Sequence, residues 1–128
     1  MIDWNHKYRK LTSCDSNGLI VVFMKHNGEW VDEMVNNRKI SSVAMMKWSP
    51  DGTKICIAYQ DGHVIVGGVE GSRKWGKDVL SSVTHISWAP DSRLLVVGSK
   101  EGEIHVFDES GEHLRQLRMT GLKGVVED

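Results

Sequence analysis

The chain has 128 residues, enough for one ordinary domain, and carries 16 Lys and Arg against 17 Asp and Glu. A net charge of −1 gives no electrostatic case for binding nucleic acid or an anionic membrane surface. The longest apolar run, 19–24, is too short to span a bilayer, and the N-terminal residues carry no signal-peptide pattern. Cys14 and Cys56 lack CxxC spacing, which favours buried free thiols in a reducing compartment over a disulfide or a ligand pair.

The first part of the chain predicts four short strands joined by tight turns. Asn17-Gly18 and Asn27-Gly28 are hairpin dipeptides, and Trp30 anchors the last of the four strands. The predicted strands lie at 1–5, 10–14, 19–25 and 29–35.

The central part of the chain repeats this pattern most completely. Ser49-Pro50-Asp51-Gly52 is a turn, since proline presets φ at its second position and glycine closes it. Gln60-Asp61-Gly62 is a hairpin turn between two runs of β-branched and apolar residues. The predicted strands lie at 44–48, 54–59, 63–69 and 73–79.

The last part of the chain predicts a third copy of the unit, with Pro90-Asp91 in the first turn. Its strands are expected at 83–88, 94–98, 103–108 and 113–119. The unit boundaries are therefore approximately 1–39, 40–80 and 81–119, and 120–128 begin a further unit or form a tail.

Two independent markers keep the three units in register. Trp4, Trp48 and Trp88 are separated by 44 and 40 residues, and so are Gly18, Gly62 and Gly102. Four strands in a period of about 40 to 45 residues are typical of WD-type propeller blades. The WD dipeptide itself survives only approximately, as Phe107-Asp108 in the third unit. The fold expected is all-β: a partial WD-type β-propeller of about three four-stranded antiparallel blades.

Several residues have structural roles in this prediction. Each of Trp4, Trp48 and Trp88 has a site between blades to fill. Asp15 and Asp61 lie at turns between second and third strands, where a carboxylate can accept hydrogen bonds from backbone amides.

The sequence gives no support for a catalytic, cofactor-binding or metal site. Residues 71–78 resemble a phosphate-binding loop, but Asp78 replaces the Ser or Thr that would hold magnesium. We interpret this stretch as a turn and strand, with Trp75 packed on a neighbouring blade. The histidines form no HExxH or HxH pattern, and no serine lies in a GxSxG elbow. We expect a protein that is not an enzyme and uses no cofactor.

Two long segments resemble a known family. NGEWVDEMVNNR (27–38) and KICIAYQDGHVIVGGVEGSRKWGKD (54–78) are similar to the N-terminal propeller of the WD-repeat subunits of intraflagellar transport complex A. The upstream YRKLTSCDSNGLIVVFM and the downstream GEIHVFDESG fit the same family, so the resemblance covers nearly the whole chain. Tubby-like proteins with WD repeats are similar in these blades, although 36–38 and 75–78 favour the transport subunit.

The resemblance implies a protein-interaction scaffold in retrograde ciliary transport and cilium assembly. The implied partners are other subunits of the transport complex and membrane-protein cargo, and the implied location is the cytoplasm and the cilium, at the axoneme and basal body. Three alternatives stay open: a tubby-like substrate adaptor, a truncated copy without independent function, and an enzyme or small-molecule binder that uses the central channel of a propeller.

Overall fold

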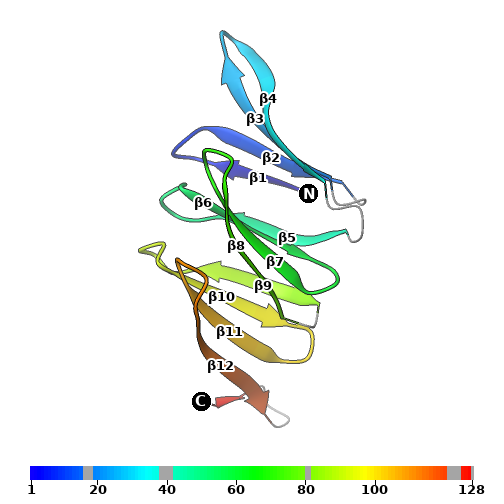
Figure 1. Ribbon diagram of the computed structural model, residues 1–128, viewed down its shortest axis with the longest axis vertical. Coiled ribbons are helices and arrows are strands. Elements are labelled where there is room, and N and C mark those ends of the chain that lie inside the picture. Colours follow the sequence, from blue (N-terminus) through cyan, green and yellow to red (C-terminus); the bar gives the residue numbers. More distant parts are fainter. Residues whose placement is uncertain (16–18, 38–41, 80–81, 121–124, 128) are drawn as a thin grey trace.

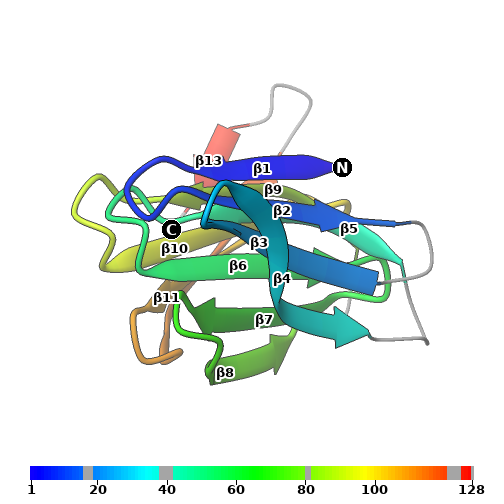
Figure 2. The same ribbon diagram turned by 90° about the horizontal axis from the view of Figure 1, so that it is seen from above.

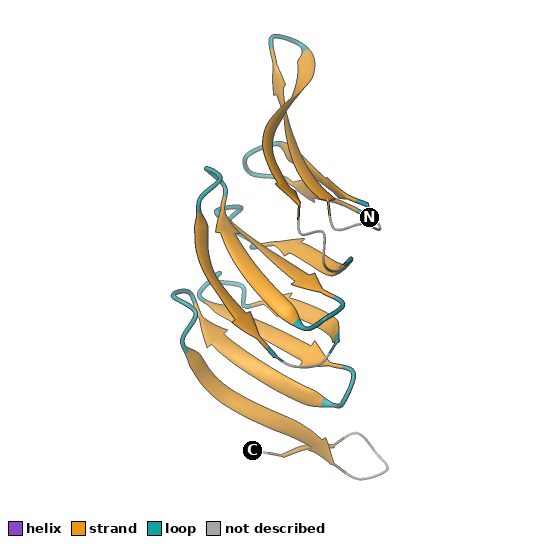
Figure 3. Cartoon of the chain, turned by 45° about the vertical axis from the view of Figure 1, so that its right-hand side comes forward, coloured by secondary structure: helices purple, strands orange, loops and turns teal. Residues whose placement is uncertain are grey.

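The computed structural model describes residues 1–15, 19–37, 42–79, 82–120 and 125–127, and every regular element among them is a β-strand (Figure 1, Figure 3). The strands form three antiparallel sheets that follow one another along the long axis of the molecule. The predicted all-β fold of three four-stranded units is thereby confirmed, and we call the sheets the first, second and third blade. The part of the chain described contains no helix long and apolar enough to cross a membrane.

Within each blade the strands are hydrogen-bonded in chain order, as a meander. The first blade contains β1 (Ile2–Asn5), β2 (Lys10–Cys14), β3 (Leu19–His26) and β4 (Glu29–Asn37). The second contains β5 (Val43–Trp48), β6 (Lys54–Tyr59), β7 (His63–Gly68) and β8 (Arg73–Asp78). The third contains β9 (Val83–Trp88), β10 (Leu94–Ser99), β11 (Glu103–Asp108) and β12 (His113–Thr120). Near the C-terminus, β13 (Val125–Glu127) pairs antiparallel with β12, so it adds a fifth strand to the third blade.

The repeat extends to irregularities of the backbone. Between the third and fourth strands the register shifts at Val22/Phe23, at Val66/Gly67 and at Val106/Phe107. These sites are again 44 and 40 residues apart. A bulge bends a strand and increases its twist, so each outer strand turns away from its blade at the same point.

The first strands of successive blades are neighbours, because β1 contacts β5 and β5 contacts β9. Seen from above, β1 lies at one side of the stack and β8 at the other (Figure 2). The first strands therefore form one column along the molecule and the fourth strands lie away from it, as stacking about a propeller axis requires.

The hydrophobic core lies between the blades. The first seam, between the first and second blades, contains Ile20, Val22, Met46, Trp48, Ile55, Ile57, Tyr59 and Ile65. The second seam, between the second and third blades, contains Cys56, Ala58, Val64, Val66, Trp75, Val79, Val83, Ile86, Trp88, Leu95, Val97 and Phe107.

Strand β6 belongs to both seams. Ile55 and Ile57 lie in the first seam, whereas Cys56 and Ala58 lie in the second, because successive side chains of a strand point to opposite faces. This explains why the run KICIAY is apolar at nearly every position instead of alternating. Cys56 is a fully buried free thiol, and burial raises its pKa well above the usual value.

Candidate interaction surface

Two of the three periodic tryptophans occupy the seams. Trp48 is 6% exposed and its indole N–H donates to Thr12 Oγ1 of the first blade at 2.8 Å. Trp88 is 9% exposed and its indole N–H donates to the carbonyl oxygen of Lys47 in the second blade at 3.1 Å. Each indole thus fills a seam and satisfies its polar atom on the preceding blade, which is how a buried tryptophan is normally accommodated.

Trp4, at the equivalent position of the first blade, is 45% exposed. Among the residues that the structure describes, no second blade packs on it, and it meets the ring of Trp30 from its own blade edge to face, with centroids 6.3 Å apart. The two rings border a surface pocket of about 560 Å³, whose other lining residues are Tyr8, Arg9, Met24 and Lys25.

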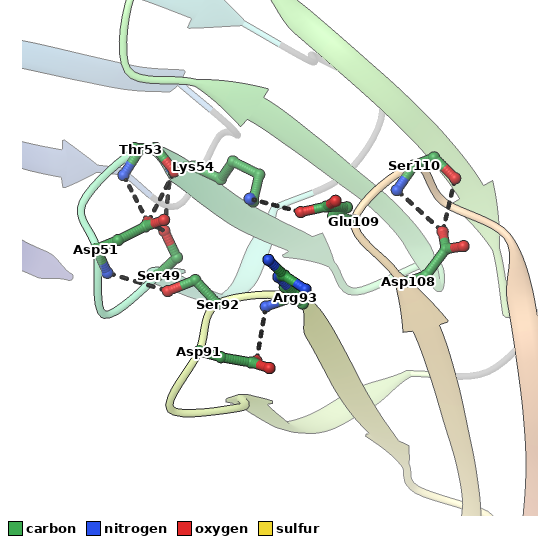
Figure 4. Close-up of polar contacts among 10 residues, drawn as sticks. All are labelled: Ser49, Asp51, Thr53, Lys54, Asp91, Ser92, Arg93, Asp108, Glu109 and Ser110. Carbon is green, nitrogen blue, oxygen red and sulfur yellow. Dashed lines mark hydrogen bonds and ion pairs between the residues drawn. The ribbon is translucent and has the colours of Figure 1, made fainter.

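A chain of polar contacts joins the turns between first and second strands from blade to blade. The side-chain amide of Asn5, itself buried, donates to the carbonyl of Gly52 at 2.8 Å. The N–H of Asp51 in turn donates to Ser92 Oγ at 3.0 Å (Figure 4). The same rim of the molecule is therefore linked across both seams.

Lysines at the start of second strands repeat a further contact. Lys10 donates from Nζ to the carbonyl of Val69 at 2.9 Å, and Lys54 Nζ lies 3.9 Å from Glu109 Oε2 (Figure 4). In each case the lysine reaches the turn between the third and fourth strands of the next blade. The equivalent residue of the third blade is Leu94, which is exposed.

The carboxylate of Asp51 organises its own turn. It accepts hydrogen bonds from the N–H and the hydroxyl of Thr53 and from the hydroxyl of Ser49, at 2.7 to 3.0 Å. Burial alone would raise the pKa of Asp51. The hydrogen bonds from Thr53 and Ser49 outweigh burial and lower the pKa to about 2. The turn therefore carries a fixed negative charge next to the second seam.

The other residues singled out in the sequence lie in turns and at one seam. Asp15 accepts from the N–H of Leu19 at 3.0 Å, and Asp61 accepts from the N–H of His63 at 3.1 Å. Gly62 and Gly102 have φ of +91° and +83°, a backbone conformation that favours glycine. Gly18 lies outside the described residues.

Asp108 caps the turn that follows it. It accepts from the N–H and the hydroxyl of Ser110 and from the N–H of Glu112, and these donors, the Ser110 hydroxyl first, lower its pKa. The turn that it shapes is pressed against the second blade, since Gly111 packs on the indole of Trp75. Trp75 also lies 5.3 Å from the ring of Phe107, centroid to centroid.

The structure brings together two histidines that the sequence analysis did not connect. His105 Nδ1 lies 3.2 Å from His113 Nε2 across the β11–β12 hairpin, and His105 Nε2 lies 3.3 Å from Glu103 Oε2. The two histidines border a pocket of about 430 Å³ between β8 and the third blade. Burial, and then the neighbouring His113, hold the pKa of His105 below its usual value. His113 lies opposite Phe107, two residues from His105, because of the register shift at Val106/Phe107, so no local sequence signal marks this pair.

The segment that resembles a phosphate-binding loop is not one. Its last six residues form β8, an antiparallel strand paired with β7, and not the N-terminus of a helix. Among the described residues, no group of three or more His, Cys, Asp or Glu is arranged to hold a metal ion.

Solved structures share this arrangement of blades. The C-terminal WD40 domain of Sif2 matches with a TM-score of 0.81 at 13% identity, over 92% of this chain and 36% of that one. A chain of the mitotic checkpoint complex matches with a TM-score of 0.75 at 21% identity, again over 92% and 36%. The chain is thus a partial β-propeller of the WD40 type.

The chain belongs to the WDR35/TULP4 N-terminal β-propeller family, whose model matches residues 1–128. WD repeat-containing protein 35 of Homo sapiens is 46% identical over 126 residues, which are 98% of this chain and 11% of that protein. The Mus musculus protein of the same name gives the same identity and coverage. Tubby-related protein 4 of Homo sapiens is 42% identical over 79 residues, 62% of this chain and 5% of that protein. The chain therefore spans about a tenth of the length of the first of these relatives.

Proposed function

We propose that this chain is a non-catalytic protein-interaction scaffold, acting as part of the propeller of an intraflagellar transport complex A subunit in retrograde ciliary transport and cilium assembly. Its partners are other subunits of that complex and membrane-protein cargo, in the cytoplasm and the cilium. The observation that carries the proposal is the identity of 46% along nearly the whole chain with WD repeat-containing protein 35. The tubby-like alternative has less support, because that similarity covers 62% of the chain.

The residues that recur from blade to blade make contacts between blades, and this supports the proposal of a scaffold. Contacts between blades are made by Trp48 and Trp88, by Asn5 at the end of β1 and by Asp51 in a turn. These contacts hold the surfaces of the blades in fixed relative positions. A rigid stack of this kind can present its turns and outer edges to partner proteins without ordering itself on binding, which lowers the entropic cost of association.

The test is to express the tagged 128-residue chain in ciliated cells and to follow its location and its co-purifying proteins. We expect enrichment at the ciliary base and recovery of subunits of the transport complex. Trp48→Asp, which places a carboxylate in the first seam, is the control that should abolish both signals. A diffuse distribution with no transport subunits recovered would contradict the proposal, and recovery of a substrate-adaptor complex would favour the tubby-like alternative.

A further inference from the structure

His105 and His113 are held close together beside the second seam. His105 is the third residue of β11 and His113 is the first residue of β12, so both belong to one hairpin of the third blade. Nδ1 of His105 lies 3.2 Å from Nε2 of His113. The buried ring of Phe107 packs against both imidazoles, with centroids 6.3 Å from that of His105 and 5.1 Å from that of His113. Packing therefore fixes the two rings next to each other.

The distance between the two facing nitrogens matches the separation of two ligands on one metal ion. Imidazole nitrogens bind zinc at about 2.0 to 2.1 Å, so two of them at a tetrahedral angle are about 3.4 Å apart. The observed 3.2 Å lies within a few tenths of an ångström of that value. Since imidazole is a ligand that suits zinc, the pair can hold this ion with only a small movement of either ring.

Glu103 is placed to orient the first of these two ligands. Its Oε2 lies 3.3 Å from Nε2 of His105, the nitrogen that does not face His113. A carboxylate at that position favours a proton on Nε2, which leaves the lone pair of Nδ1 directed at His113. Histidines that bind metals almost always have such a partner on their second nitrogen, because it fixes both the tautomer and the orientation of the ring. The side chains of His105 and Glu103 are only 9% and 18% exposed, so this contact is largely shielded from solvent.

A cation can reach the pair through the pocket of about 430 Å³ that both histidines border. His113 is exposed whereas His105 is buried, so one ligand is open to solution and the other is held inside. The charged residues that line the pocket are three carboxylates and one lysine: Asp78, Glu101, Glu103 and Lys77. The excess of negative charge raises the local concentration of cations, and the pocket has room for water molecules on the ion.

We propose that His105 and His113 bind one Zn²⁺ ion, through Nδ1 of His105 and Nε2 of His113, with Glu103 as a positioning residue. Without the metal, Nε2 of His113 carries a proton that is directed at Nδ1 of His105. Zinc takes the place of that proton, which moves to Nδ1 of His113. Two protein nitrogens leave coordination positions open, and water in the pocket fills them. The site goes beyond the scaffold function and does not depend on it.

The test is a calorimetric titration of zinc chloride into the 128-residue chain, purified without a histidine tag. The wild-type chain should bind one Zn²⁺ ion, and His113→Gln should lose this binding because it removes one of the two ligands. His113 is exposed, so we expect this variant to fold, and far-UV circular dichroism verifies that it does. His63→Gln is the matched control and should bind like the wild type. His63 also has a ring nitrogen beside a carboxylate, 2.7 Å from Oδ1 of Asp78, but lies outside the pair.

The chemical shifts of the imidazole nitrogens show which atoms hold the ion. In a ¹⁵N-labelled wild-type chain, zinc should shift Nδ1 of His105 and Nε2 of His113 and leave the other histidines unchanged. This measurement needs no substitution, so it is decisive even where a variant disturbs the fold.

The variant Glu103→Gln tests the positioning residue. Zinc should stay on the same two nitrogens, but its affinity should fall by about tenfold or more, as is usual when the carboxylate partner of a metal-binding histidine is lost. An affinity equal to that of the wild type would overturn the role of Glu103. A wild-type chain that binds no zinc, binding that survives His113→Gln, or zinc attached to other nitrogens would each overturn the site itself. The transport role is untouched by these outcomes, since no ciliary partner takes part.

Discussion

At the scale of single residues, one side-chain type has two different environments in this molecule. Trp48 and Trp88 are buried and donate hydrogen bonds across a seam, whereas Trp4 is about half exposed at the same repeat position. The difference does not come from the place in the strand, because all three lie at the last or next-to-last residue of a first strand. It comes from whether another blade lies against the indole.

We expect Trp48→Ala and Trp88→Ala each to lower the free energy of unfolding by about 3 to 5 kcal/mol, because each empties a buried site. Trp4→Ala should lower it by less than about 1 kcal/mol, as is usual for an exposed position. Urea unfolding followed by far-UV circular dichroism measures the three values.

Trp48→Phe is the control that separates packing from hydrogen bonding at the first seam. It keeps an aromatic ring but removes the donor to Thr12, a loss of about 1 kcal/mol for the hydrogen bond alone. A loss below about 1 kcal/mol for Trp48→Ala or Trp88→Ala would contradict the packing role of these residues.

At the scale of elements, the turns between third and fourth strands differ in what surrounds them. Gly28 and Gly111 have similar φ, +84° and +90°. A Cβ on Gly28 would meet nothing within 4 Å, whereas a Cβ on Gly111 would lie 2.6 Å from Cγ of Trp75. The first turn needs glycine for its backbone alone, and the last turn also needs it for the close approach of the second blade.

Alanine at these two glycines should therefore have unequal effects. Gly28→Ala should lower the free energy of unfolding by about 1 to 2 kcal/mol, because alanine is strained in the left-handed backbone conformation. Gly111→Ala adds an overpacking term of about 1 to 3 kcal/mol at Trp75. The same urea titrations give both values, and equal losses for the two variants would show that the turn at Gly111 is not held against the second blade.

Strands and turns could be predicted from the sequence because their signals are local. The turn dipeptides and the apolar runs indicate each strand of the three units, and every observed boundary of β1 to β12 lies within two residues of the expected one. Strand β13 is not among the expected strands. The pairing of His105 with His113 could not be predicted in this way, because it depends on the register shift at Val106/Phe107 that places His113 opposite Phe107. The exposure of Trp4 depends on a neighbour that no local pattern describes.

At the scale of the whole molecule, stability is distributed over seams and not over blades. Each blade has little core of its own, and both buried clusters lie between blades. In stacked repeats of this kind the terminal units lack one neighbour and contribute less than the inner ones. The second blade, with a seam on either side, is therefore the most stable part of the chain.

The thermal transition of the 128-residue chain should be broad. We expect this because the second blade has a seam on either side, whereas the first and third blades each share one, so the units differ in stability. Circular dichroism followed over a range of temperature measures the width of the transition. A single sharp transition would contradict the expectation.

The double role of β6 has a consequence for how such a protein can change in length during evolution. Since one strand contributes to the seam before it and, through its alternate residues, to the seam after it, no half of a blade is self-sufficient. Inserting or removing the coding sequence of a whole blade preserves the packing at the seams on both sides. Inserting or removing part of a blade leaves two surfaces that do not match. Duplication and deletion should therefore be tolerated in whole blades only.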